Sequence, residues 1–161
     1  MASIKTLERV LPGESEHIDF NVAGRVYTFP KELKAVGAHL TKATEILTFS
    51  DNWDDDGANA TDADTFFQAA DFLQAYSGTI FRRFGAVLVK PYVDITRDGS
   101  VSIRWETESG VMFIIFKKWP AEFAYFYAER RSDKTAFEST AVKIGAAPDD
   151  SLVQWMRTYL V

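Results

Sequence analysis

The stretch VDITRDGSVSIRW, residues 93–105, decides the fold class. Apolar and polar residues alternate on both sides of Asp98-Gly99, a pattern typical of two strands joined by a tight turn. A two-residue loop there would pair Ile95 with Ser102 and place the apolar side chains on different faces. A three-residue loop over 97–99 instead pairs Ile95 with Val101. We therefore predict a type I turn with a bulge, and Gly99 at positive φ.

More strands follow this hairpin. Val111–Phe116 and Phe123–Ala128 are strand-length apolar runs, and a weaker alternating run covers Ala136–Ile144. Because residues 111–116 are apolar at successive positions, we expect that strand to be central and covered on both faces. The short turns between these runs indicate an antiparallel meander of four or five strands.

A second hairpin is predicted upstream, where alternating runs flank Ala23-Gly24. A two-residue loop at this point pairs Phe20 with Tyr27 and Ile18 with Phe29, so that all four side chains share one face.

Helical spacing marks the remaining segments. Pro30 opens a helix whose apolar stripe consists of Leu33, Val36, Leu40, Ala43 and Leu47. Thr61 is the expected cap of a second helix with Ser77-Gly78 as its end, and its buried face is predicted to comprise Ala63, Phe66, Phe67, Ala70, Phe72 and Leu73. A third helix is expected from Pro148-Asp149-Asp150, and a short helical pattern occupies residues 3–11.

These elements predict a single α+β domain over residues 1–161. Its expected parts are an N-terminal β-hairpin, two amphipathic helices, the antiparallel meander and a C-terminal helix.

Composition narrows the classes of function. The chain has 23 acidic and 18 basic residues and a net charge of −5, whereas nucleic-acid binders usually have a basic excess. We therefore expect no direct nucleic-acid binding. No apolar run is long enough to span a bilayer, and none follows Lys5 as a secretory signal would require. The chain lacks cysteine, which excludes disulfides and thiolate sites and is compatible with the cytoplasm.

The acidic turn NWDDDGA, residues 52–58, is the candidate site, and it has several interpretations. Asn52, Asp54 and Asp56, followed by Gly57, match the opening of a calcium loop and could hold Ca²⁺ or Mg²⁺, although the expected glutamate at position 63 is alanine. Alternatively, Asp54, Asp55 and Asp56 point outward and contact a basic protein partner. Clustered carboxylates could also serve acid–base chemistry. In the purely structural interpretation, Trp53 anchors the turn in the core while the aspartates bond turn amides.

Aromatic residues provide a second candidate surface. Phe123, Tyr125 and Tyr127 share one strand face, and we expect them to pack against helices. Trp119 lies in the turn before that strand and is the best candidate for an exposed partner contact.

Motifs for catalysis are absent from the sequence. The only histidines are His17 and His39, and there is no Gly-x-Ser-x-Gly motif or glycine-rich phosphate loop. This absence favours a protein that is not an enzyme.

The motifs resemble a widespread family of small bacterial proteins with an Asn-Trp-Asp-Gly-x-Gly-Ala-type motif. The residues that carry the resemblance are Asn52-Trp53-Asp54, Gly57-Ala58, Pro91, Asp98-Gly99, Val101 and Trp105. Asp55 and Asp56 depart from the family's pattern. The resemblance covers residues 35–160 and implies an α+β fold without an established activity.

Two functional hypotheses follow. The favoured one is a small acidic, non-enzymatic protein-binding module or inhibitor, of the antitoxin, immunity or anti-defence type. The alternative is a divalent-cation-binding protein or metal-dependent enzyme that uses the acidic turn.

Overall fold

The computed structural model describes residues 16–118 and 122–161. The helical pattern predicted at 3–11 and the contact residue Trp119 lie outside the described residues. Within them, the α+β architecture predicted from the sequence is confirmed. The elements in chain order are β1 (His17–Val22), β2 (Arg25–Pro30), η2 (Lys31–Leu33), α2 (Lys34–Ala43), η3 (Thr44–Thr48), α3 (Ala63–Phe84), β3 (Tyr92–Ile95), β4 (Val101–Glu106), β5 (Gly110–Phe116), β6 (Phe123–Arg130), β7 (Ala141–Lys143) and α4 (Asp150–Tyr159).

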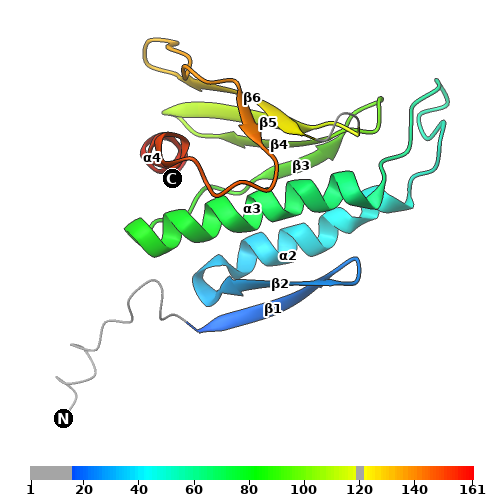
Figure 1. Ribbon diagram of the computed structural model, residues 1–161, viewed down its shortest axis with the longest axis horizontal. Helices are drawn as coiled ribbons and strands as arrows, with labels where there is room; N and C mark the ends of the chain where they lie inside the picture. Colours follow the sequence, from blue (N-terminus) through cyan, green and yellow to red (C-terminus); the bar gives the residue numbers. More distant parts are fainter. Residues whose placement is uncertain (1–15, 119–121) are drawn as a thin grey trace.

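The elements form three layers (Figure 1). The β1–β2 hairpin packs on α2 and α3, and α3 in turn packs against β4 and β5 of the five-stranded sheet. Figure 1 shows α3 beneath that sheet, and none of the helices within residues 16–118 and 122–161 lies on the sheet's opposite face. The hydrophobic core therefore fills the space between the helices and one face of each sheet.

The N-terminal hairpin has the predicted register, with Phe20 paired to Tyr27 and Ile18 to Phe29. Gly37 of α2 allows the hairpin to pack closely on this helix, because a Cβ at this position would lie 2.3 Å from the Phe20 ring. Gly37 is thus the point where the hairpin contacts the helix.

The predictions for α3 were partly wrong at its ends. Its cap is Asp62, whose carboxylate accepts a hydrogen bond from the Thr65 amide at 2.8 Å, and not Thr61, which is buried. Ala63 is exposed, although the other predicted core residues of this helix are buried. The helix also continues past Ser77 to Phe84, and Gly85 follows as its C-cap with φ +64°. The small residues in its middle are buried against neighbours and do not stop it.

The five-stranded sheet is an antiparallel meander in the order β3-β4-β5-β6-β7. Val93 pairs with Ile103 and Ile95 with Val101, as the three-residue loop requires, and Gly99 has φ +84°. The last predicted strand is shorter than expected. Only Ala141–Lys143 forms a strand there, preceded by an isolated bridge between Glu129 and Ala136.

The strand β5 is central, as predicted, but the expectation that both of its faces are covered was wrong. Met112, Ile114 and Phe116 are fully buried on the face toward α3, whereas Phe113 on the opposite face is 40% exposed. Consecutive apolar residues in a strand favour burial on both faces. Here one of the two faces is open.

Among the described residues, no helix combines the length and hydropathy needed to cross a bilayer.

Candidate functional site

The acidic turn between η3 and α3 is closed by its own side chains. Asp54 Oδ1 accepts hydrogen bonds from the amides of Asp56 at 2.9 Å and Ala58 at 3.0 Å. Asn52 Oδ1 accepts another from the Gly57 amide at 2.8 Å. Short polar side chains that bond nearby amides are a common way to stabilise tight turns. The side chains of Asn52 and Asp54 therefore stabilise the conformation of the turn itself.

Arg97, in the β3–β4 turn, connects the acidic turn to the sheet. Its Nε donates to Asp54 Oδ2 at 2.7 Å, and its Nη2 lies 3.4 Å from Asp56 Oδ2. The Arg97 carbonyl accepts a hydrogen bond from the Asn59 amide at 2.7 Å. Burial acts to raise the pKa of Asp54, but the amides of Asp56 and Ala58 together with the Arg97 guanidinium lower it below its usual range. Asp54 is thus held as a carboxylate that joins two segments of the chain.

Trp53 is anchored within the turn and not in the main core. Its Nε1 donates to the Asn59 carbonyl at 2.9 Å, and its ring stacks on Phe49 with centroids 5.8 Å apart. The indole is half-buried, and Phe49 is itself 46% exposed. The prediction that this tryptophan is rooted in the interior was therefore only partly right.

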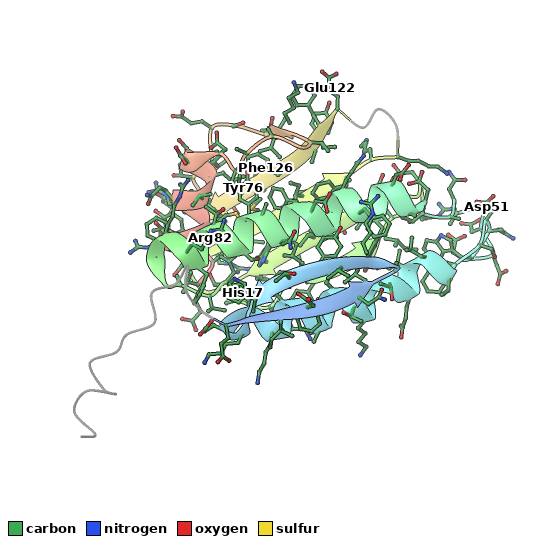
Figure 2. All side chains as sticks on the ribbon, turned by 60° about the horizontal axis from the view of Figure 1, so that its bottom comes forward. His17, Asp51, Tyr76, Arg82, Glu122 and Phe126 are labelled. Carbon is green, nitrogen blue, oxygen red and sulfur yellow. The ribbon has the colours of Figure 1, made fainter. Side chains whose placement is uncertain are left out.

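The three predicted contact aspartates differ in their positions. Asp55 and Asp56 are exposed, with the Asp56 side chain 85% accessible, but the Asp54 side chain is only 19% accessible. The expectation that all three carboxylates point outward was wrong for Asp54, because its oxygens accept hydrogen bonds from amides and from Arg97. Figure 2 shows the neighbouring Asp51 at the far end of the molecule from α4.

The predicted cation ligands are engaged in the same network. Oδ1 of Asn52 and both carboxylate oxygens of Asp54 already accept hydrogen bonds from N–H groups. Across residues 16–118 and 122–161, no three His, Cys, Asp or Glu side chains gather in a group that could hold a metal ion. The Ca²⁺ or Mg²⁺ site at Asn52, Asp54 and Asp56 stays a prediction.

The open face of the sheet presents a group of aromatic side chains. Phe113 of β5 is 40% exposed, and Tyr125 and Tyr127 of β6 are 47% and 38% exposed. Phe113 pairs with Tyr127 in the β5–β6 register, and their ring centroids lie 5.9 Å apart. Ile115 pairs with Tyr125 beside them. We call these four residues the aromatic face.

Charged groups surround the aromatic face. Arg104 pairs with Phe113 in the β4–β5 register, and its guanidinium lies 5.5 Å from the Tyr92 ring centroid. Glu129 accepts a hydrogen bond from the Tyr127 hydroxyl at 3.2 Å. The sheet therefore carries an apolar centre with a polar border.

The sequence prediction that Phe123, Tyr125 and Tyr127 share one strand face is confirmed, since their positions alternate with buried Ala124, Phe126 and Ala128. The accompanying expectation that they pack against helices was wrong. The buried face of β6 is the opposite one, which carries Ala124, Phe126 and Ala128, and Phe123 itself is 37% exposed.

The two histidines do not form a recognisable catalytic arrangement. His17 is exposed, and His39 Nε2 is buried without a hydrogen-bond partner. Burial, reinforced by Lys90 and Lys42, lowers the pKa of His39.

Comparison of the chain with protein-family models, curated proteins and solved structures gave no significant match.

Proposed function

We propose that this protein is a small, non-enzymatic protein-binding module, of the inhibitor type, whose contact surface is the aromatic face. The observation that carries the proposal is the exposure of Phe113, Tyr125 and Tyr127 side by side on β5 and β6, two adjacent inner strands of the five-stranded sheet. Large contiguous apolar groups on the surface of a domain mark sites of interaction.

The composition of this surface supports a protein partner. Protein interfaces place aromatic residues at a dry centre and charged residues at a solvated rim, and tyrosine contributes much contact area with few rotatable bonds. The aromatic face has this arrangement, with Arg104 and Glu129 at its border.

The position of the surface also favours binding. The aromatic side chains alternate along β5 and β6 with residues that are fully buried beneath them, so the backbone that holds them is fixed by the core. A contact surface on such strands loses little conformational entropy when a partner docks.

The net charge of −5 favours a basic partner, and exposed Asp55 and Asp56 contribute to the negative field that would attract one. The proposal places the protein in the cytoplasm, in agreement with a chain that contains no cysteine.

A co-precipitation from the native host tests the proposal. Tagged wild type is compared with the double variant Phe113→Ser plus Tyr125→Ser, at low and at high salt. We expect wild type to recover a stoichiometric partner, high salt to reduce its recovery, and the double variant to lose it.

The matched control is Val26→Ser, which replaces an apolar side chain that is 66% exposed on the hairpin layer. This control should recover the partner like wild type. Recovery of the same partner by the double variant would show that the aromatic face is not the contact surface.

A further inference from the structure

A cavity of about 600 Å³ lies between α3 and the segment 137–149 that carries β7. Its lining includes Tyr76 of α3 and Phe126 of β6, which Figure 2 labels. The cavity is partly open to solvent, so a small molecule has a path into it. It also lies on the helix side of the sheet, away from the aromatic face.

The size and walls of the cavity fit a small molecule. Small-molecule sites commonly measure about 300–1,000 Å³ and are lined mainly by apolar and aromatic side chains. Here Phe72 and Tyr76 stack with centroids 4.1 Å apart, and Phe137 lies 5.8 Å from Phe126. A flat aromatic ring would contact these surfaces well.

One polar group in the wall lacks a partner. The Gln68 Oε1 atom is buried and accepts no hydrogen bond. Other polar groups of the lining are engaged: the Tyr76 hydroxyl accepts from the Asp149 amide at 3.0 Å, and Asp71 accepts from the Tyr27 hydroxyl at 2.6 Å. Because the Gln68 Oε1 atom is buried, a molecule in the cavity does not reach it, and the lining offers a ligand mainly apolar contacts.

The charges around the cavity decide which ligand it prefers. Two acidic residues, Asp71 and Asp149, and one basic residue, Lys143, contribute to its lining. The excess of negative charge favours a cation over an anion of the same shape. Aromatic rings in the wall add to this preference, because a ring face attracts a cation.

From the size of the cavity, its aromatic walls and its charge we infer that it binds a small aromatic amine. The ring lies against Phe72, Tyr76 and Phe126, and the ammonium group lies toward the end of the cavity that carries Asp71 and Asp149. This site is independent of the proposed protein-binding function, because it uses the opposite side of the sheet.

A matched pair of probes tests the inference. Tryptamine and indole-3-propionate share a ring and a two-carbon chain and differ in the charge at its end. We expect tryptamine to give saturable calorimetric binding and amide NMR shifts confined to the cavity lining, with indole-3-propionate at least about tenfold weaker. Equal binding of the two probes, or no saturable binding of tryptamine, would overturn the inference.

Two variants locate the site. Ala75→Leu places a larger side chain in the wall and should abolish tryptamine binding. Ala63→Leu changes an exposed alanine on the same helix, outside the cavity, and should bind like wild type. Circular dichroism checks that each variant is folded. Wild-type affinity in folded Ala75→Leu would contradict the assignment.

Discussion

The acidic turn and the aromatic face make an informative comparison, because each differs from what its residue types suggest. The turn combines three aspartates and a tryptophan, and it resembles a site in the sequence. In the structure its key oxygens bond the turn's own amides and Arg97. The aromatic face resembles core in the sequence, yet Phe113, Tyr125 and Tyr127 are exposed.

The difference teaches that residue types alone do not distinguish a contact surface from a structural element. What matters is whether the groups find partners within the chain. Asp54 finds them and is mostly covered, whereas Phe113, Tyr125 and Tyr127 stay 38–47% exposed although Phe113 contacts Tyr127, which makes the rings the better candidate for binding.

The largest expected effect is the difference in stability loss between substitutions on the two faces of β5. Phe116→Ala removes a side chain that is 1% exposed and should destabilise the fold by about 3–5 kcal/mol. Phe113→Ala removes the same atoms from the open face and should cost less than about 1 kcal/mol. Urea denaturation measures both. Equal losses would show that the aromatic face belongs to the core.

The docking of the acidic turn on the β3–β4 turn can be broken at Gly99. This residue has φ +84°, and an added Cβ would lie 2.7 Å from the Ala60 carbonyl oxygen. Gly24 is a matched control, with φ +88° and open space around it. Gly99→Ala should therefore cost about 1–3 kcal/mol more than Gly24→Ala in the free energy of unfolding. Equal costs would indicate that backbone strain, and not docking, dominates at Gly99.

The role of Asp54 predicts a dependence of stability on pH. Its pKa is lowered in the folded state, so between the folded and unfolded pKa values the unfolded chain binds more protons and stability rises with pH. The contribution is present above the unfolded pKa, about 3.9, and is lost as the pH falls through the folded pKa.

Thermal unfolding from neutral to strongly acidic pH measures this effect. Asp54→Asn should flatten the acidic part of the curve, and Arg97→Gln should flatten it in part. The pKa values of Asp98 and Asp133 are also lowered, so the stability of both variants should still fall somewhat as the pH becomes acidic. If the stability curves of both variants ran parallel to that of wild type, Asp54 would not be a source of the pH dependence.

The smallest expected effect is that of divalent cations on the melting temperature. Because the oxygens of Asn52 and Asp54 accept N–H donors, millimolar calcium or magnesium should shift the melting temperature by less than about 1 °C. A larger rise that disappears in Asp54→Ala would instead favour the cation-binding hypothesis. Differential scanning fluorimetry suffices for both measurements.

Much of the fold could be predicted from local patterns. The registers at Phe20–Tyr27 and Ile95–Val101 follow from the need to keep apolar side chains on one face, and the positive φ of Gly99 follows from the loop length. The start of α4 at Pro148-Asp149-Asp150 could also be predicted from the sequence. Asp149 caps this helix, because its carboxylate accepts a hydrogen bond from the Leu152 amide at 2.9 Å. These features depend on residues close together in the chain.

The site could be predicted less well, because it depends on long-range contacts. The pairing of Asp54 with Arg97 joins residues that are 43 positions apart, and no local pattern indicates it. The end of α3 was misplaced because buried Ser77 and Gly78 look like a helix stop in sequence. The alternation in β6 revealed a shared face for Tyr125 and Tyr127, but only the placement of the helices shows that this face is open.

The most direct test of the account is the affinity of the co-precipitated partner for two single variants, measured by calorimetry. Tyr125→Ala, on the aromatic face, should raise the dissociation constant at least about thirtyfold, as truncation at the centre of an interface does. Val26→Ala, on the hairpin, should leave it unchanged. Equal dissociation constants for wild type, Tyr125→Ala and Val26→Ala would contradict the claim that the aromatic face binds the partner.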